Sequence, residues 1–255
     1  MPRGYVAGLF DLTGKHALVT GGGSGLGAAI ALGFAQAGAR VSIVDINLST
    51  ARQITSAIQS SGGVAEGYSA DVTIRDSLQK VAVEVGPVDI LVNSAGTYAR
   101  YAAEDFPEDA YDRILNINLK GTFLCCQVFG RPMLERGSGA IINLASIGAS
   151  VAYPYSTAYL QSKGGVAQMT RSLALEWITR GVRVNAIAPS LFDTPLARTS
   201  DDTETPTNAF IMARTPIGRR GKPREVVGAA IFLASAASEM VTGHILQVDG
   251  GYLTN

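Results

Sequence analysis

The chain has 255 residues, and its 21 Lys and Arg balance its 21 Asp and Glu, so no excess of positive charge points to nucleic acid or a membrane surface as a partner. Hydrophobic residues make up 47% and charged residues 16%, which excludes an intrinsically disordered chain. No apolar run approaches the roughly 20 residues that span a bilayer, and the first ten residues lack the apolar core of a signal peptide, so we expect a soluble cytoplasmic protein.

Short and long apolar patterns alternate along the chain. Short apolar, often β-branched runs predict strands at 16–20, 40–44, 88–92, 140–144 and 182–187. Longer stretches with helical spacing begin near Gly25, Leu48, Ile74, Asp109, Ser156 and Pro223. Apolar strands that alternate with helices are typical of a parallel sheet covered on both faces. No linker, composition shift or repeat interrupts the pattern, so we predict one α/β domain over residues 1–255.

The first predicted strand runs into a glycine-rich turn that opens the first helix. Glycines allow a tight turn and close approach of the backbone to a pyrophosphate, and a helix N-terminus offers free N–H groups. This placement indicates a dinucleotide site; the alternative is that glycine ends the strand for structural reasons alone. The cofactor-binding residues expected here are Gly21, Ser24, Gly25, Leu26 and Gly27.

Asp45 ends the second predicted strand, about 20 residues after the glycines. A carboxylate here can accept hydrogen bonds from the adenosine ribose and would repel a 2′-phosphate. Ser24 stands where a basic residue could hold that phosphate, and no basic residue directly follows Asp45. Both observations favour NAD over NADP. The alternative is that Asp45 only caps the turn that follows it.

Cysteine and histidine do not indicate a metal site. The two cysteines, Cys125 and Cys126, are adjacent in an apolar run, where thiols behave as small hydrophobic groups. The two histidines, His16 and His244, lie far apart, and no Cys/His cluster has the spacing of metal ligands. We therefore expect no bound metal.

Tyr159 and Lys163 lie four residues apart, on one face of a predicted helix. A phenol has a pKa of about 10 and is a poor base at neutral pH. A nearby ammonium favours the phenolate and could lower that pKa by roughly 1–3 units. The pair is thus a candidate acid/base site. The alternative is a half-buried ring beside a solvated amine.

The one long irregular stretch, about 190–221, follows the last of the predicted strands and is rich in Thr, Asp and Pro. An open α/β domain places its ligand crevice beyond the carboxyl ends of its strands, and long loops in compact domains tend to be functional or mobile. We hypothesise that this segment is a substrate loop that acts as a lid. A disordered surface insertion is the alternative.

Several short signals stand together in one order along nearly the whole chain. They are TGGGSGLG at 20–27, Asp71-Val72, Asn93-Ser94-Ala95-Gly96, Asn118, Ser146, Tyr159 with Lys163, the run from Arg183 to Pro189, and Val248-Asp249-Gly250-Gly251. The chain resembles the short-chain dehydrogenase/reductase family, and within it most resembles bacterial NAD-dependent polyol and sugar-alcohol dehydrogenases. The resemblance implies a single Rossmann-type, doubly wound domain with a seven-stranded parallel sheet.

The resemblance also implies a nicotinamide cofactor and assigns further residues to it. Asp71 and Val72 are expected at the adenine, the turn with Asn93, Ala95 and Gly96 under the cofactor, and Pro189 and Thr194 at the nicotinamide. Tyr159 and Lys163 would also contact the cofactor. Where the family usually has Pro-Gly, this chain has Pro189-Ser190, and serine takes positive φ less freely than glycine.

The implied reaction is hydride transfer between NAD and a secondary alcohol or ketone. Tyr159 would act as acid/base, Lys163 would lower its pKa, Ser146 would orient the substrate oxygen, and Asn118 would hold a water of the proton relay. Ser146 and Asn118 could instead be ordinary structural polar residues. Tyr153 and Tyr155 could line the pocket, but neither has a lysine four residues on.

A small polyol or sugar alcohol is the leading substrate hypothesis. The alternatives are a 3-oxoacyl-(acyl-carrier-protein) reductase and a non-catalytic NAD-binding regulator. The helices near 119–134 and 159–177 carry more apolar surface than one sheet face needs, and family members often pair these helices, so we expect a homotetramer.

Overall fold

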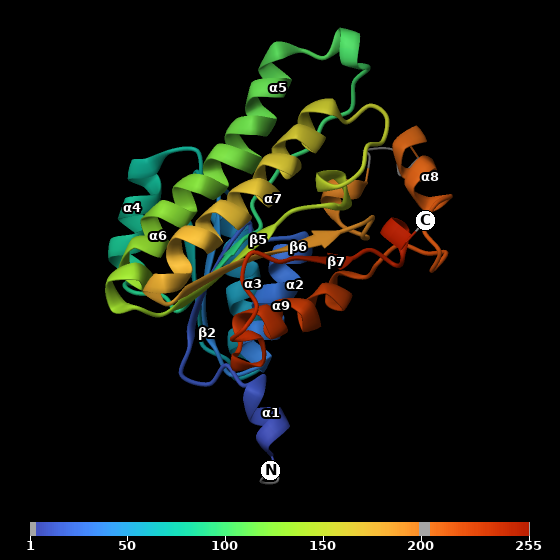
Figure 1. The fold of residues 1–255 in the computed structure, drawn as a ribbon. Helices are drawn as coiled ribbons and strands as arrows, with labels where there is room; N and C mark the ends of the chain where they lie inside the picture. Colours follow the sequence, from blue (N-terminus) through green and yellow to red (C-terminus); the bar gives the residue numbers. More distant parts are fainter. Residues whose placement is uncertain (1–3, 199–204, 255) are drawn as a thin grey trace.

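Within the described residues, seven parallel strands form one sheet in the order β3-β2-β1-β4-β5-β6-β7 (Figure 1). The computed structural model describes residues 4–198 and 205–254. Both the predicted fold class and the seven-stranded parallel sheet are confirmed. The strands are β1 His16–Thr20, β2 Arg40–Asp45, β3 Ala65–Ser69, β4 Ile90–Asn93, β5 Gly139–Leu144, β6 Val182–Pro189 and β7 Ile245–Val248.

Helices cover both faces of the sheet (Figure 1). They are α1 Tyr5–Leu9, α2 Gly25–Gln36, α3 Leu48–Ser60, α4 Arg75–Val85, α5 Glu108–Leu115, α6 Thr122–Arg136, α7 Thr157–Trp177, α8 Pro206–Met212 and α9 Val227–Ala234. A π-helical stretch, η2 Asn116–Gly121, joins α5 to α6. No described helix is both long enough and apolar enough to cross a membrane.

The two largest hydrophobic clusters of the described residues lie one on each side of the sheet. The first joins α2, α3 and α9 to the sheet through side chains such as Phe34, Ile58 and Leu233. The second joins α4, α6 and α7 through side chains such as Leu78 and Phe129. Burial of both sheet faces explains why the central strands are apolar at nearly every position.

Most element bounds fall within two residues of the sequence prediction, and two strands were missed as separate elements. The strand β3 (AEGYS) has one fully buried residue, and β7 (ILQV) also has one, because both lie at the edges of the sheet. Their sequences therefore lack the apolar run of a central strand. The segment 190–221, predicted as irregular, contains the helix α8, and its residues 199–204 lie outside the described residues.

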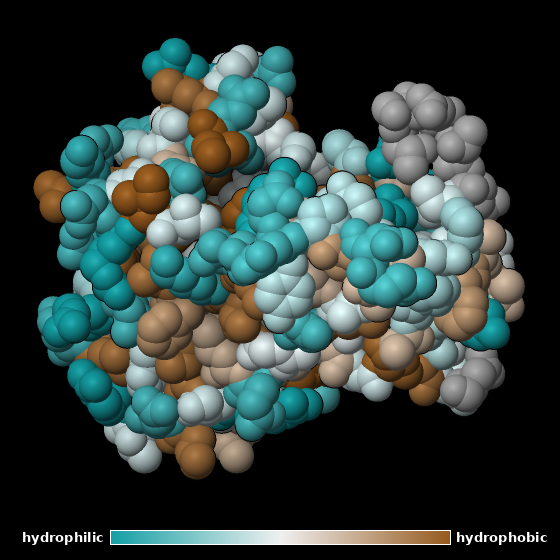
Figure 2. Space-filling model, turned by 90° about the horizontal axis from the view of Figure 1, so that it is seen from above, coloured by the Kyte–Doolittle hydropathy of each residue, from teal (hydrophilic) through white to brown (hydrophobic). Residues whose placement is uncertain are grey.

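The strand order reverses between β1 and β4, which are neighbours in the sheet. The chain leaves β1 toward one face and β4 toward the other, so a crevice opens at the carboxyl ends of these two strands. Seen from above, hydrophobic side chains lie in separate patches among hydrophilic ones on this face of the molecule (Figure 2).

Candidate active site

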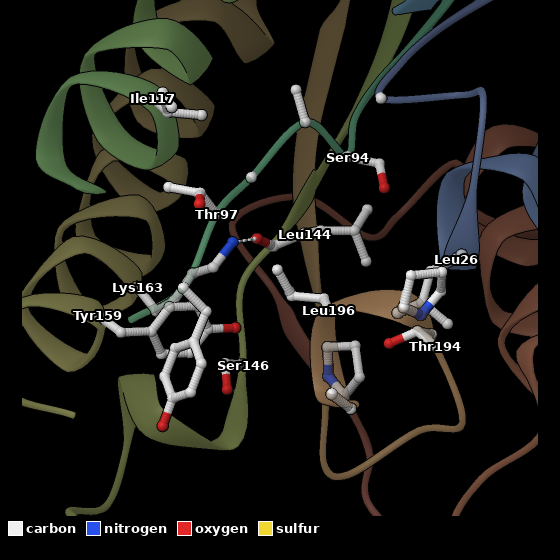
Figure 3. A pocket seen from close by; sticks show the side chains of 18 of the residues that line it. Leu26, Ser94, Thr97, Ile117, Leu144, Ser146, Tyr159, Lys163, Thr194 and Leu196 are labelled. Atoms are coloured by element: carbon white, nitrogen blue, oxygen red, sulfur yellow. Dashed lines mark hydrogen bonds between the residues drawn. The ribbon is translucent and has the colours of Figure 1, made fainter. Parts of the chain in front are cut away.

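A cavity of about 810 Å³ lies at the carboxyl ends of the strands. Its wall takes residues from the loops after β1, β2, β3, β4, β5 and β6 and from the helices α5, α7 and α8. Predicted site residues on the wall are Gly21, Ser24, Gly25, Leu26, Asp45, Asp71, Val72, Ala95, Gly96, Ser146, Tyr159, Lys163, Pro189 and Thr194. Segments far apart in the sequence thus meet at one site, part of which is shown in Figure 3.

The glycine-rich turn brings the backbone close to the loop after β4. Gly21 has a φ of +62°, and a Cβ built on it would lie 2.7 Å from the Ala95 backbone. A Cβ on Gly27 would lie 2.3 Å from the Gly21 carbonyl oxygen, so Gly27 serves close packing of α2 and is outside the cavity wall. The α2 N-terminus has no acidic residue in its first turn and no side-chain cap. Its N–H groups are available to an anion.

Asp45 holds the glycine-rich turn and the turn after β2 at the same time. Its Oδ2 accepts a hydrogen bond from the Gly23 N–H at 3.0 Å, and its Oδ1 accepts one from the Asn47 N–H at 3.0 Å. Asp45 therefore caps the turn that follows it, and it also lines the cavity. A carboxylate has about four lone-pair sites, so Asp45 retains capacity for a ligand hydroxyl.

Asp71 and Val72 lie on the wall beyond Asp45. The Asp71 Oδ1 accepts hydrogen bonds from the Thr73 N–H at 2.8 Å and the Thr73 hydroxyl at 2.7 Å. These bonds fix the turn after β3, and Val72 presents an apolar side chain that is 8% exposed. This end of the cavity suits a flat, weakly polar ring.

Tyr159 and Lys163 project from α7 toward Ser146, which follows β5 (Figure 3). The Lys163 Nζ donates to the Leu144 carbonyl at 2.7 Å and lies 5.6 Å from the centroid of the Tyr159 ring. The Ser146 Oγ accepts from the Gly148 N–H at 3.1 Å. Three elements therefore place a phenol, an ammonium and a hydroxyl at one end of the cavity.

Burial dominates the protonation equilibria of this group. It raises the pKa of Tyr159 to about 12, although the neighbouring Ser146 hydroxyl lowers it. Burial also lowers the pKa of Lys163 to about 8. The lowering of the Tyr159 pKa by Lys163 stays a prediction: here the Lys163 Nζ donates to a backbone carbonyl, and burial sets the direction of the Tyr159 shift.

Two further tyrosines adjoin the phenol of Tyr159. The Tyr98 ring meets the Tyr159 ring edge-on, with centroids 4.8 Å apart, and its hydroxyl shares a hydrogen bond with Ser156. Tyr153 is buried in the cavity wall, which raises its pKa well above the usual value. Tyr155 is 48% exposed and lies outside the wall, with a φ of +61°.

Asn118 and Asn93 do not reach the cavity wall. The Asn118 amide accepts from the Thr97 N–H at 2.8 Å and donates to the Thr97 carbonyl at 3.0 Å and the Ser162 hydroxyl at 3.1 Å. The Asn93 amide donates to the Asn143 Oδ1 at 2.9 Å. Both side chains face inward: Asn118 ties the loop after β4 to α7, and Asn93, the last residue of β4, binds β5. Their roles toward a cofactor and a relay water stay predictions.

The segment after β6 forms the opposite side of the cavity, where Thr194 and Leu196 lie (Figure 3). The Ser190 Oγ is buried with no hydrogen-bond partner, and Ser190 does not have a positive φ. The strain considered for serine after Pro189 is therefore absent.

Comparison with known proteins assigns the family. A family model described as enoyl-(acyl carrier protein) reductase matches residues 21–253. The chain is 44% identical to the D-threitol dehydrogenase of Mycolicibacterium smegmatis over 95% of this chain and 94% of that protein. It is 41% identical to the 2-dehydro-3-deoxy-D-gluconate 5-dehydrogenase of Bacillus subtilis over 98% of this chain and 99% of that protein. The chain belongs to the short-chain dehydrogenase/reductase family.

A solved structure agrees with this assignment. It is a protein from Beutenbergia cavernae described as an NAD(P)-dependent gluconate 5-dehydrogenase with bound NADP. It has a TM-score of 0.91 and 40% identity, and the match covers 97% of this chain and 100% of that chain. The family prediction is confirmed, as is the prediction of an enzyme of the dehydrogenase/reductase class that acts on CH–OH groups.

The cavity fits the nicotinamide dinucleotide that short-chain dehydrogenases bind. The glycine-rich turn leaves no room for side chains beside Ala95, and the uncapped α2 N-terminus can receive a pyrophosphate. The wall continues from this turn to Tyr159 in one volume. In the described residues, no group of three His, Cys, Asp or Glu side chains is arranged to hold a metal ion.

Sequence reasoning missed Tyr98 and Arg100 as wall residues. Both follow the Asn93–Gly96 motif, and both line the cavity from the loop after β4. Their closeness to that motif was the available signal. Thr207, Asn208 and Ile211 of α8 also reach the wall, within the segment predicted as a substrate loop.

Proposed function

We propose that the protein is an NAD-dependent dehydrogenase that transfers a hydride between the nicotinamide and a secondary alcohol or ketone, with a small polyol or sugar alcohol as substrate. The observation that carries the proposal is the convergence of Ser146, Tyr159 and Lys163 at one end of a cavity whose other end is the glycine-rich turn. The names of relatives, a threitol dehydrogenase among them, support a polyol.

When bound, NAD supplies the acceptor for the hydride. Gly21, Ser24, Gly25 and Leu26 would hold its pyrophosphate, and Pro189 and Thr194 would lie at the nicotinamide, as the cavity wall supports. Asp71 and Val72 would border the adenine. Ala95 and Gly96 would lie beneath the cofactor.

Tyr159 is the acid/base group of the proposal. With a pKa of about 12 its phenol is protonated at neutral pH, so it is ready to donate a proton to a ketone oxygen. In alcohol oxidation the phenolate takes the hydroxyl proton, and an ammonium of Lys163 turned from the Leu144 carbonyl toward the phenol favours that state. Ser146 orients the substrate oxygen by hydrogen bonding.

Asn118 belongs to the proton path as a positioning residue. Its amide binds Thr97 on one side and Ser162, next to Lys163, on the other. It therefore holds the loop under the cofactor against the helix that carries the acid/base pair. A water of the relay would be bound near Asn118 rather than by its amide protons, which are already donated within the protein.

The choice of NAD rests on Asp45, since a carboxylate at the adenosine ribose repels a 2′-phosphate. Ser24 adds no positive charge on the facing turn. A solved structure that is 40% identical to this chain has bound NADP, so the kinetic test of the proposal compares both cofactors. The cytoplasmic location and the homotetramer stay predictions; exposed Phe123 on α6 and Leu175 on α7 support assembly through those helices.

The segment 190–221 is proposed as the substrate loop. Its residues Leu191, Phe192 and Leu196, with Ile211 of α8, give the cavity an apolar side opposite the acid/base group. Protease cleavage in this segment should slow when cofactor and substrate are both present. Equal cleavage with and without them would contradict a lid.

The first experiment is to follow NADH absorbance with the purified protein, crossing NAD and NADP with polyols, sugar alcohols and simple secondary alcohols. Turnover with NAD and a polyol is expected. Oxidation of NADPH by a 3-oxoacyl thioester, with no activity on any alcohol, would favour an acyl-carrier-protein reductase, the alternative to which the name of the family model is closest. Cofactor binding without turnover on either panel would favour a regulator.

A further inference from the structure

Arg100 is a cation on the wall of the cavity that the proposed reaction does not use. It comes from the loop after β4, and its guanidinium lies over the Tyr98 ring, with Cζ 4.5 Å from the ring centroid. One terminal nitrogen donates to the Asn208 Oδ1 on α8 at 3.3 Å. The Nε is buried and has no hydrogen-bond partner.

No carboxylate neutralises this charge in the part of the chain that the structure describes. The ion pairs there join Arg136 to Asp89, Arg198 to Asp193 and Arg219 to Glu225. The acidic residues on the cavity wall are Asp45 and Asp71, and both bind the turns at the proposed cofactor end. A guanidinium is always protonated, and a buried donor left unsatisfied is costly. The cavity therefore has a preformed place for an anion.

The position of Arg100 assigns that anion to the substrate. Tyr98 contacts both Arg100 and the acid/base group: the Arg100 Cζ lies 4.5 Å from the centroid of its ring, and that centroid lies 4.8 Å from the centroid of the Tyr159 ring. Arg100 and Tyr159 are thus neighbours of one aromatic ring on the wall of the same cavity. An anion at Arg100 would belong to the same molecule as the carbinol that Tyr159 deprotonates, several carbon atoms along its chain.

We propose that Arg100 binds a carboxylate of the substrate, so that the preferred substrate is a sugar acid of the aldonate type rather than a neutral polyol. This inference rests on the proposed hydride transfer and changes its substrate from a neutral polyol to a sugar acid. The Nε and a terminal nitrogen of a guanidinium form a planar fork that matches the two oxygens of a carboxylate. The same guanidinium contacts Asn208, so carboxylate binding would also order α8 over the substrate.

The test compares matched substrates that differ only at one terminal carbon, gluconate with glucitol and threonate with threitol. The wild-type protein with NAD is expected to give the higher kcat/KM for the aldonate of each pair. In Arg100→Met the aldonate-to-alditol ratio of kcat/KM should fall about 10- to 100-fold, which is the range of a hydrogen bond to a charged group. Arg100→Lys should retain part of the preference, because it keeps the charge without the fork.

Arg180→Met is the matched control, because Arg180 is exposed, lies outside the cavity and should leave the ratio unchanged. A second readout is calorimetric titration of gluconate into the protein saturated with NADH. Its affinity should fall in Arg100→Met and be partly retained in Arg100→Lys. If Arg100→Met does not fold, Arg100→Lys and the wild-type substrate pairs still decide the question.

The outcomes separate this inference from the proposed function. Turnover of alditols by the wild type with an aldonate-to-alditol ratio below one, unchanged in Arg100→Lys and Arg100→Met, would leave the dehydrogenase in place and overturn the role of Arg100. A preference for a sugar phosphate over the aldonate would also overturn it. No turnover of either class, with gluconate binding that depends on Arg100, would contradict the dehydrogenase and support the carboxylate site.

Discussion

The ammonium of Lys163 is bonded to the Leu144 carbonyl at 2.7 Å, and not to the phenol of Tyr159 one helical turn away. Leu144 is the last residue of β5, so the lysine links α7 to the end of the strand that precedes Ser146. The same side chain therefore fixes the geometry of the site and carries its positive charge. Its contribution to stability and its contribution to the acidity of Tyr159 can be separated by experiment.

Replacement of Tyr159 by Phe should lower kcat about 10²- to 10⁴-fold, because it removes the group that exchanges a proton with the substrate oxygen. The edge-on contact with Tyr98 involves the ring and should survive, so the melting temperature should change little. Steady-state kinetics with NAD and the best substrate, beside a thermal melt, check both statements. Tyr155→Phe is the control, since Tyr155 lies outside the cavity wall; wild-type-like turnover by Tyr159→Phe would refute the mechanism.

Stability should depend on pH through Lys163 in the alkaline range. Burial lowers its pKa to about 8 from 10.5, so between these values the unfolded chain binds more protons than the folded one. Stability due to this group therefore rises as pH increases from 8 to 10.5, by at most about 1.4 kcal/mol per pH unit. Urea unfolding of wild type and Lys163→Met at several pH values measures the difference. If the free energies of unfolding of the two proteins differ by the same amount over this range, the pKa of Lys163 is not lowered in the folded chain.

Tyr159 makes the free energy of unfolding fall, rather than rise, as pH increases above 10. Its pKa is about 12 in the folded chain and 10.0 ordinarily. The stability that this group provides is complete below pH 10 and is lost as pH rises toward 12. The Lys163 effect is therefore best measured below pH 10, where Tyr159 is protonated in both states.

Asp45→Ala should raise kcat/KM with NADP relative to NAD, because it removes a negative charge from the proposed site of the 2′-phosphate. It should also raise the KM for NAD, because the Gly23 N–H loses its acceptor and the glycine-rich turn loosens. Asp45→Asn keeps an oxygen that can accept from Gly23 and removes the charge. We expect the cofactor preference to shift in both variants and the KM for NAD to increase more in Asp45→Ala. An unchanged preference in both variants would contradict the assignment of Asp45 to the adenosine ribose.

The central strands and the main site residues could be predicted because their signals are local. β1, β2, β4, β5 and β6 are buried on both faces and read as apolar runs. The order of the motifs predicts one shared site for Ser146, Tyr159 and Lys163, and all three line the same cavity. The edge strand β3 could not be found in this way, since its sequence includes an exposed Glu66 and a glycine.

Side-chain direction could not be predicted from spacing. The family resemblance implies a place for Asn118 in the proton relay, and that role stays a prediction; what spacing could not give is the direction of its amide, which the π-helical stretch turns toward Thr97 and Ser162. The partner of Lys163 likewise depends on how α7 packs against β5, which no local pattern encodes. Arg100 went unnoticed because its unpartnered Nε exists only once the loop after β4 meets α8.

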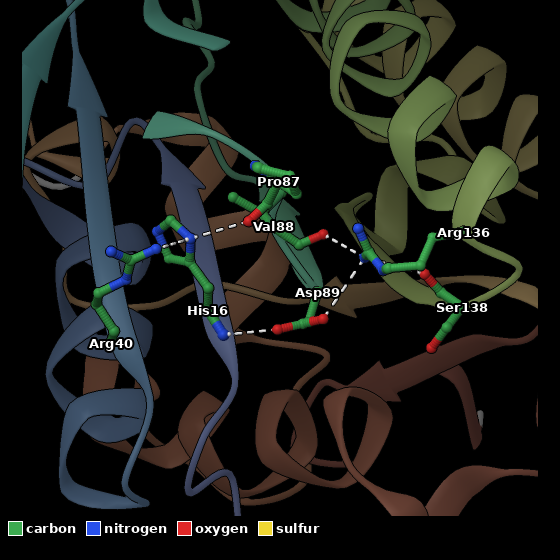
Figure 4. Close-up of polar contacts among 7 residues, drawn as sticks. All are labelled: His16, Arg40, Pro87, Val88, Asp89, Arg136 and Ser138. Atoms are coloured by element: carbon green, nitrogen blue, oxygen red, sulfur yellow. Dashed lines mark hydrogen bonds and ion pairs between the residues drawn. The ribbon is translucent and has the colours of Figure 1, made fainter. Parts of the chain in front are cut away.

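Protonation of His16 should lower the stability of the protein in mild acid. His16 belongs to a polar cluster at the end of β1 that lies away from the cavity (Figure 4). The Arg40 guanidinium donates to the His16 Nδ1 at 2.7 Å, and the His16 Nε2 lies 2.9 Å from the Ser42 hydroxyl. A guanidinium only donates, so Nδ1 is the acceptor and the imidazole is neutral. The 3.1 Å contact between Nδ1 and the Pro87 carbonyl becomes a hydrogen bond only after protonation, which breaks the bond to Arg40.

Burial and the charge of Arg40 lower the pKa of His16 below 6.5, and the Pro87 carbonyl, Asp89 and Glu66 oppose this only in part. Just below pH 6.5 the unfolded chain therefore binds more protons at this group than the folded chain does. The stability that the group contributes is complete above pH 6.5 and is lost as pH falls below it. Urea unfolding from about pH 7.5 to about pH 5.5, around the ordinary histidine pKa, should show a steeper loss for wild type than for His16→Gln. Equal slopes would mean that His16 accepts its proton without losing Arg40.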